Sequence, residues 1–276
     1  MLSTPVLSPY KAGVTPVLLI GCGRMGGAML EGWLGARAFP PADVLVAAPR
    51  PNLAARAAEY EGAVLNPEPE LLAGAQTVVL AVKPQKWREV AEEYRDRLWP
   101  DAVIISVAVG VRADDISDVF GGRRTARVMP TTGVAGGKGV ASIYAADAEA
   151  RARAHRLFDP IATTVDIERE DLMDVAAATS GSAPAYLYAF TEALAAAGAE
   201  LGLEPDAALK LATATMVSAA ARLDGSASSL AELRAEVASP GGTTEAALKV
   251  LMGENGFEPL MRRALAAAVK RAEELR

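Results

Sequence analysis

The chain has 276 residues, of which 51% are hydrophobic and 22% are charged, a balance typical of a globular protein with a large core. Its net charge of −6 gives no basic surface of the kind that nucleic-acid binding needs. The single cysteine, Cys22, and the single histidine, His155, exclude a disulfide framework and leave no set of soft ligands for a metal. No metal site is predicted, and chemistry carried by an organic cofactor is favoured.

Residues 1–15 have the composition of a disordered lead. They lack the charged and apolar regions of a signal peptide. No stretch of the chain reaches about 18 uninterrupted apolar residues, so no membrane-spanning helix is predicted. We therefore expect a cytoplasmic protein.

From residue 16 onward, short apolar runs alternate with helical patterns. Runs without polar alternation are typical of a parallel sheet that is covered on both faces. The pattern predicts an α/β fold, with a Rossmann-type parallel-sheet domain over residues 16–168. Its predicted strands are 16–20, 44–47, 77–82, 103–108, 126–129, 141–144 and 162–167, and its predicted helices include 25–36, 53–60, a short one at 71–72, and 87–98.

The second part of the chain, residues 169–276, is rich in alanine and predicted to be wholly helical. Its predicted helices are 174–201 with a kink at Pro184, 205–223, 230–238, 243–252 and 257–275. Alanine faces let helices approach closely but bury little area. We therefore expect an all-α dimerisation domain that pairs with a second copy, although a self-contained bundle stays open.

A glycine motif follows the first predicted strand and opens the first helix, the context that a dinucleotide-binding turn requires. Gly21 permits the tight turn, Gly23 lets the backbone approach a pyrophosphate, and Gly26 lets the helix pack against the strand. Phosphates would then lie on the amides of the helix N-terminus. The candidate cofactor residues here are Gly21, Cys22, Gly23, Arg24, Met25 and Gly26.

The end of the second strand indicates which dinucleotide would bind. NAD-binding domains usually place an acidic residue there to hold the ribose hydroxyl. This chain instead has Ala47 and Ala48, followed two residues later by Arg50, whose guanidinium can bind a 2′-phosphate. The sequence therefore favours NADP(H), with NAD(H) kept as an alternative and an ordinary surface arginine as the simpler interpretation.

Ligands bind at the carboxyl ends of parallel strands, so residues that follow the later strands are also candidates for cofactor binding. Small residues there leave room for a ring, although Lys83 could equally be a solvated residue at a strand end. These candidates are Ala81, Val82, Lys83, Pro84, Ala108, Met129 and Thr131.

Two further motifs lie in the helical part. Residues 179–186 place Gly181 and Pro184 in an alanine-rich helix, which either frees polar groups for a ligand or forms a packed kink. Residues 239–244 place two glycines before a helix, so that bare amides and the helix dipole could seat a carboxylate; a simple N-terminal turn is the alternative.

Taken together, these residues resemble pyrroline-5-carboxylate reductases over residues 17–275. The most specific part of the resemblance is Ser239-Pro240-Gly241-Gly242-Thr243-Thr244, supported by residues 180–186 and 81–84. The resemblance implies NAD(P)H as donor, a cyclic imino acid as substrate, and homo-oligomers built from dimers. It also implies a substrate site between the nicotinamide of one subunit and the helical domain of its mate, with Thr244 contacting the ring nitrogen. The implied substrate residues are Val237, Ser239, Gly241, Gly242, Thr243 and Thr244.

The chain departs from the family at three places. Thr131 and Gly133 stand where the family usually has asparagine and proline, and Glu68 replaces an asparagine near the adenosine, with Asn66 close by. Glu245 replaces an apolar residue. A glutamate in a first helical turn is favourable for the helix dipole, but pointed inward it would oppose an anionic substrate.

The expected reaction is the NADPH-dependent reduction of 1-pyrroline-5-carboxylate to L-proline, the last step of proline biosynthesis. Alternatives are reduction of another cyclic imino acid, and a non-catalytic NADP-binding regulator. Hydroxy-acid dehydrogenases of similar architecture need a lysine on the helix from Asp174, which has none before Lys210, and this argues against them.

Overall fold

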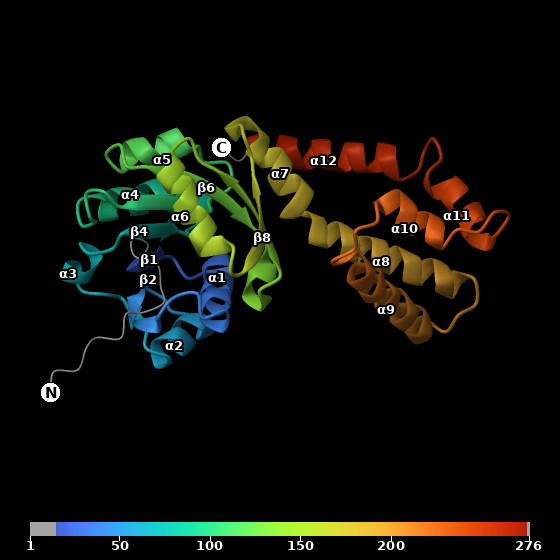
Figure 1. The fold of residues 1–276 in the computed structure, drawn as a ribbon, viewed down its shortest axis with the longest axis horizontal. Helices are drawn as coiled ribbons and strands as arrows, with labels where there is room; N and C mark the ends of the chain where they lie inside the picture. The colour runs from blue at the N-terminus through green and yellow to red at the C-terminus, as the bar shows by residue number, and fades with distance from the viewer. Residues whose placement is uncertain (1–14, 275–276) are drawn as a thin grey trace. The chain divides into compact units, whose positions relative to one another are not determined.

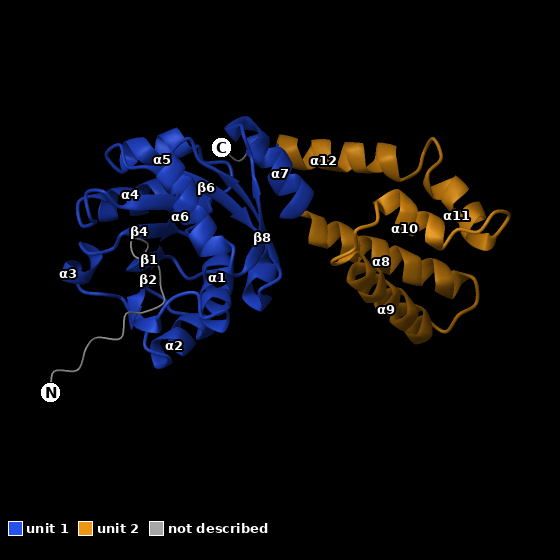
Figure 2. Ribbon diagram, in the orientation of Figure 1, with its two compact units in different colours: residues 1–181, 271–276 blue, residues 182–270 orange. Residues whose placement is uncertain are grey.

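The computed structural model describes residues 15–274, so the predicted disordered lead lies outside the described residues except for Thr15. The chain divides into two compact units (Figure 2). The first comprises residues 1–181 with 271–276, and the second comprises residues 182–270. Each unit is described by itself.

The first unit is built on an eight-stranded sheet with the strand order β3-β2-β1-β4-β5-β6-β7-β8 (Figure 1). The strands are β1 (Val17–Ile20), β2 (Val44–Ala47), β3 (Val64–Leu65), β4 (Thr77–Leu80), β5 (Val103–Ser106), β6 (Thr125–Pro130), β7 (Gly139–Tyr144) and β8 (Ala162–Asp166). Every neighbouring pair is parallel except β6 and β7, so the prediction of a wholly parallel sheet is wrong at that pair. The reason is the connection, because the 3-10 helix η3 (Thr132–Gly136) is too short for the crossover that parallel strands need.

Both faces of the sheet are covered, as predicted from the apolar strands. Leu19, Val79 and Ile105 face one hydrophobic cluster, while their neighbours Leu18, Val78 and Ile104 face the other; all six are fully buried. The first cluster includes residues of α1 (Arg24–Gly35), α2 (Leu53–Tyr60) and α6 (Ala148–Phe158). The second includes residues of α3 (Pro69–Leu72), α4 (Trp87–Arg95) and α5 (Ala113–Val119). The sequence interpretation did not assign β3, α5 or α6.

The predicted helix 174–201 is two helices, α7 (Met173–Ser180) and α8 (Ala183–Glu200), so the predicted kink is wrong. The helical conformation is interrupted at Gly181 and Ser182. Pro184 lies in the first turn of α8, where the amide hydrogen that proline lacks would have no acceptor within the helix. Because α7 packs against β6 and β7, it belongs to the first unit. The two compact units divide after Gly181, so that α7 is grouped with the sheet.

The second unit consists of helices only. They are α8, α9 (Pro205–Leu223), α10 (Leu230–Glu236), α11 (Thr243–Leu251) and α12 (Phe257–Glu274), whose last residues are assigned to the first unit. The bounds of α9 match the predicted 205–223. Helices α8 and α9 pack closely, and a Cβ at Gly198 of α8 would lie 3.6 Å from the Cβ of Ala208 in α9.

Large apolar side chains of the second unit stay exposed. Between residues 182 and 270, the buried hydrophobic residues are the three alanines Ala195, Ala208 and Ala212. Leu211 and Val217 of α9 are 57% and 65% exposed. The unit does not bury its larger side chains within one chain, which agrees with the predicted pairing with a second copy.

Within residues 15–274, no helix is long and apolar enough to cross a membrane. Among the same described residues, no group of three or more histidine, cysteine, aspartate or glutamate side chains is arranged to hold a metal ion.

Candidate active site

The carboxyl ends of β1, β2, β4, β5 and β6 meet at one edge of the sheet. Backbone hydrogen bonds continue beyond the strands, since the Gly21 amide donates to Ala47 O at 2.9 Å and the Ala81 amide to Ile20 O at 2.8 Å. The amide of Val107 donates to Leu80 O at 3.2 Å. The loops that carry the predicted cofactor residues of the first unit therefore start from one aligned edge.

Two glycines of the dinucleotide motif are required by packing. Gly21 has φ of +92°, and a Cβ there would lie 2.7 Å from the carbonyl oxygen of Ala81. A Cβ at Gly26 would lie 2.2 Å from the carbonyl oxygen of Gly21. These contacts let α1 begin directly against β1 and β4, as predicted for the first and third glycines of the motif.

Gly23 differs from these two glycines, because a Cβ there would meet no protein atom within 4 Å and packing therefore does not require a glycine. Gly23 is the N-cap of α1, and no side chain caps it. The amides of residues 23–26 have no acceptor among the described residues, and the first turn of α1 carries no acidic side chain. Open space over uncapped amides at a helix N-terminus is where a pyrophosphate fits.

Three basic residues follow β1, β2 and β4 at this edge of the sheet. Arg24, Arg50 and Lys83 are exposed, and none of them forms an ion pair with the described residues. Their side chains are therefore available to the anionic groups of a dinucleotide.

Cys22 lies inside the motif, but its thiol is buried. The Sγ atom donates to Asn52 Oδ1 at 3.3 Å, and the same oxygen caps α2 by accepting from the Ala55 amide at 2.9 Å. Burial, and then the charge of Glu31, raise the pKa of the Cys22 thiol. The side chain thus joins the motif to the start of α2, and Asn52 is a residue that the sequence interpretation missed. Its signal was the position three residues before Ala55, at the start of an alanine-rich run.

The end of β2 is held by Asn66. This residue has φ of +48°, its amide donates to Val46 O at 2.7 Å, and its Oδ1 accepts from the Ala48 amide at 2.8 Å. Asn66 thereby fixes the turn that leads to Arg50. Glu68, which replaces the family's asparagine, is the N-cap of α3 and gives no side-chain cap.

The loop after β4 carries the four predicted residues 81–84. Pro84 begins the 3-10 helix η2 (Pro84–Lys86), with Lys83 as its N-cap. A cavity of about 390 Å³ adjoins this loop, where α4 and α5 begin. It is lined by Pro84, Gln85, Trp87, Arg88, Gly110, Val111, Arg112 and Asp115.

Ala108, Met129 and Thr131 lie at the ends of β5 and β6 and are buried. The Thr131 hydroxyl accepts a hydrogen bond from the Val140 amide at 3.0 Å, and the Thr131 amide donates to Val140 O at 2.8 Å. Thr131 therefore ties the β6 end to β7. A Cβ at Gly133 would lie 2.9 Å from Lys138 O, so this chain's departure at Gly133 accompanies a close backbone approach.

The predicted substrate loop lies in the second unit, between α10 and α11. Val237 is 68% exposed at the end of α10, and Gly241 has φ of +72°. The Gly242 amide donates to Ser239 O at 3.0 Å, so the turn uses this donor. The amides of Thr243 and Thr244, in the first turn of α11, have no acceptor among the described residues.

Residues 179–186 include the break between α7 and α8, and two of their hydroxyls bond back to α7, which agrees only in part with the simpler interpretation. Thr179 Oγ1 donates to Val175 O at 2.8 Å, and Ser180 Oγ donates to Ala176 O at 2.9 Å. Both hydroxyls thus bond back to their own helix.

A buried charge cluster in the first unit was missed by the sequence interpretation. Arg127 of β6 is 3% exposed and pairs with Glu170 of the 3-10 helix η4 (Glu170–Leu172) at 3.1 Å. Glu170 also accepts from the Ala113 amide at 2.6 Å and pairs with Arg112 at 3.4 Å. The cluster joins β6 to the start of α5. Its signal was an arginine between apolar residues of a predicted strand.

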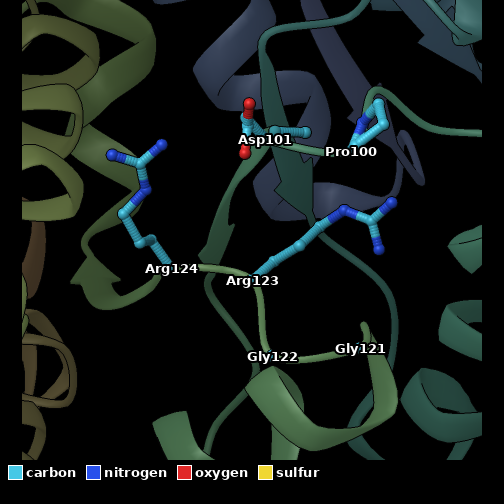
Figure 3. Close-up of a pocket in the computed structure, with 7 residues that line it drawn as sticks. Pro100, Asp101, Gly121, Gly122, Arg123 and Arg124 are labelled. Carbon is cyan, nitrogen blue, oxygen red and sulfur yellow. The ribbon is translucent and has the colours of Figure 1, made fainter.

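A pocket of about 240 Å³ lies where β5 and β6 begin, at the edge of the sheet opposite the predicted cofactor residues; Figure 3 shows its lining residues. Arg123 and Arg124 lie just before β6, and their side chains diverge. The guanidinium of Arg123 donates to the carbonyl oxygens of Phe120 at 2.5 Å and Trp99 at 3.2 Å. None of the predicted cofactor residues lines this pocket, so it is not the predicted cofactor site.

The Rossmann-type sheet, its glycine turn and the separate helical unit define an oxidoreductase of the class that uses nicotinamide dinucleotides. Two family models match: "NADP oxidoreductase coenzyme F420-dependent" over residues 16–110 and "Pyrroline-5-carboxylate reductase dimerisation" over residues 170–275. The chain belongs to the pyrroline-5-carboxylate reductase family.

Individual relatives are similar to this chain over at least 94% of its length. The pyrroline-5-carboxylate reductase of Pseudomonas aeruginosa is 34% identical, over 94% of this chain and 96% of that protein. The solved pyrroline-5-carboxylate reductase of Coxiella burnetii is 33% identical, with a TM-score of 0.86 over 95% of this chain and 98% of that one. A Plasmodium falciparum pyrroline carboxylate reductase, solved with NADP bound, is 23% identical, with a TM-score of 0.79 over 95% and 98%, and shows the shared fold.

Proposed function

We propose that the chain reduces 1-pyrroline-5-carboxylate to L-proline with NADPH as the donor, the last step of proline biosynthesis. The observation that carries this proposal is the open space above Gly23 and the uncapped amides of α1, within a chain whose relatives are pyrroline-5-carboxylate reductases. NADPH, when bound, supplies the hydride.

Residues 21–26 hold the pyrophosphate through backbone amides, and Gly23 keeps the approach clear. Arg50 holds the 2′-phosphate, with its turn fixed by Asn66. No carboxylate is present at the β2 end to bind a ribose hydroxyl, which favours NADPH over NADH. Ala81 to Pro84, Ala108, Met129 and Thr131 complete the cofactor edge.

The substrate carboxylate binds at the start of α11. The free amides of Thr243 and Thr244 supply donors, and the helix dipole adds positive potential. The Thr244 hydroxyl holds the ring nitrogen. An imine of this kind is basic enough to arrive protonated, so orientation makes the main contribution to rate.

Pairing of chains is part of the proposal. The exposed apolar side chains of the second unit need a partner, and the matching family model describes dimerisation. We infer a homodimer or an oligomer of dimers, in a protein of the cytoplasm.

The experiment is a turnover assay that follows NADPH absorbance with 1-pyrroline-5-carboxylate and identifies the product by chromatography. Formation of proline supports the proposal. Turnover only with a different cyclic imine supports the wider reductase, and NADPH binding without any turnover supports a regulator.

Thr244→Ala tests the substrate contact. Loss of a hydroxyl that holds the ring nitrogen raises KM and lowers kcat, with kcat/KM reduced about tenfold or more, because one well-placed hydrogen bond contributes about 1–2 kcal/mol. The NADPH dissociation constant stays unchanged. Thr243→Ala, which removes a neighbouring hydroxyl and keeps the amide, is the matched control. Full activity of Thr244→Ala would remove this residue from the mechanism.

A further inference from the structure

The carboxylate of Glu245 turns back onto the loop that precedes its own helix. Its Oε2 accepts the Gly241 amide hydrogen at 2.5 Å, and its Oε1 lies 3.1 Å from Lys249 Nζ, one turn further along α11. This side chain therefore links the 239–242 turn to the body of α11.

The backbone amides of residues 241–244 therefore differ in whether they already have an acceptor. The Gly241 amide serves Glu245, and the Gly242 amide serves Ser239 O at 3.0 Å. The amides of Thr243 and Thr244 remain without an acceptor among the residues of the described part. The Glu245 carboxylate thus occupies the Gly241 amide and leaves the amides of Thr243 and Thr244 available.

The turn has a conformation that needs support. Gly241 has a left-handed φ of +72°, and Gly242 lies so close to Ser239 that a Cβ would be 2.6 Å from its Oγ. A hydrogen bond from Gly241 to a side chain of α11 fixes the position of this turn relative to the first helical turn. The bond is charge-assisted, and the Gly241 amide and Lys249 both lower the pKa of Glu245, so its carboxylate is ionised at neutral pH.

The charge of Glu245 would by itself oppose an anionic substrate at the start of α11. Lys249 forms an ion pair with it, so the local charge is balanced. Both side chains are partly or largely exposed, with exposed fractions of 38% for Glu245 and 73% for Lys249, so this balance depends on ionic strength.

We propose that Glu245 is a positioning residue for the substrate: it holds the 239–242 turn so that the Thr243 and Thr244 amides stay open, and Lys249 balances its charge. This inference rests on the proposed function. On this inference, Glu245, which replaces an apolar residue of the family, supports anion binding instead of opposing it.

Three variants test it. Glu245→Ala removes the acceptor for the Gly241 amide, whereas Glu245→Gln keeps an acceptor oxygen and loses the ion pair. We expect Glu245→Ala to raise KM for pyrroline-5-carboxylate about five- to tenfold, with kcat changed less than about twofold and the NADPH dissociation constant unchanged. Glu245→Gln restores KM to within about twofold of the unchanged chain.

Lys249→Met tests the charge balance. This variant keeps the hydrogen bond from the Gly241 amide to Glu245 but removes the cation that balances the carboxylate. KM for pyrroline-5-carboxylate should therefore rise at low salt and return toward normal as salt screens the repulsion. A KM of Glu245→Ala equal to that of the unchanged chain, or a Glu245→Gln variant as impaired as Glu245→Ala, would overturn the positioning role. A salt-independent KM in Lys249→Met would overturn the balancing role.

A general folding defect is separated from positioning by the melting temperature and the NADPH dissociation constant. If Glu245→Ala shifts both along with KM, the residue is structural and the inference fails. Absence of turnover in the unchanged chain refutes the proposed function, and this inference with it, before any variant is compared.

Discussion

Gly23 and Gly26 are three residues apart, yet a methyl group at each would meet opposite surroundings. At Gly23 it would enter open space above the amides of α1, whereas at Gly26 it would lie 2.2 Å from the carbonyl oxygen of Gly21. Packing accounts for the second glycine, whereas the first leaves open the space that we propose a pyrophosphate occupies.

Gly23→Ala should therefore fold normally and bind NADPH poorly. We expect a stability loss below about 1 kcal/mol, since alanine is only a weaker N-cap, together with at least a tenfold higher NADPH dissociation constant. Gly26→Ala should instead lower stability by about 1–3 kcal/mol, because backbone must move. Thermal melting and fluorescence titration with NADPH measure both effects. Normal NADPH affinity in Gly23→Ala would contradict the proposed phosphate position.

We expect Arg50 to distinguish NADPH from NADH. Its exposed guanidinium has no ion-pair partner among residues 15–274, so its removal leaves the protein intact. Arg50→Ala should raise KM for NADPH about 10- to 100-fold, the effect of losing a hydrogen-bonded charge worth about 1.5–3 kcal/mol. KM for NADH should change less than about twofold. Equal effects on both cofactors would show that Arg50 does not contact the 2′-phosphate.

Among the elements, α6 and β8 are joined by the only histidine of the chain. His155 Nδ1 lies 3.0 Å from Asp159 Oδ1, and its Nε2 lies 3.3 Å from both carboxylate oxygens of Asp166, which also pairs with Arg151 at 3.1 Å. Burial lowers the pKa of His155, but hydrogen bonds and charges from the two aspartates outweigh it and raise the pKa above its ordinary value of 6.5.

This pKa shift predicts how stability depends on pH. Because the folded pKa lies above the unfolded one, the stabilisation is fully present below about pH 6.5 and is lost as the pH rises through the folded pKa. His155→Gln should flatten the decrease in melting temperature between pH 6 and pH 8.5. Asp43→Asn, which changes a charge elsewhere in the first unit, is the control. An unchanged pH profile in His155→Gln would refute this linkage.

Local sequence signals predicted the elements that depend on local causes. Pro205 starts α9, and uninterrupted apolar runs gave the buried strands. The signals failed where the cause lies elsewhere in the fold. The antiparallel pairing of β7 depends on the short η3 connection, and the assignment of α7 to the first unit depends on its packing against β6 and β7.

The residues of the candidate site likewise fall into those that local sequence signals predicted and those that they did not. The glycine turn and Arg50 could be predicted because both are recognised by their spacing along the chain. The hydrogen bonds of Asn66, the Arg127–Glu170 pair and the Gly241–Glu245 bond were not visible. The first two join segments at least 18 residues apart, and the third depends on a side-chain rotamer that no spacing specifies.

At the scale of the whole molecule, the exposed apolar side chains of the second unit predict an oligomer. Leu211 of α9 is 57% exposed and lines an apolar cavity of about 230 Å³ beside α8. Leu211→Asp would place an unpaired carboxylate in an apolar interface, at a cost of several kcal/mol. We expect its mass by light scattering to fall toward the 28.6 kDa of one chain.

The matched control is Leu53→Asp. Leu53 is 88% exposed in α2 of the first unit, so the same change there should leave the oligomer intact. Dissociation by both variants would point to general destabilisation, and an unchanged mass for Leu211→Asp would exclude this face from the interface.

Transfer of deuterium from NADPH labelled twice at C4 of its nicotinamide measures the reduction itself. With pyrroline-5-carboxylate as substrate, we expect proline one mass unit heavier, with the label on the former imine carbon. Proline without the label, or no proline at all from a chain that binds NADPH, would contradict a hydride transfer to the C=N bond.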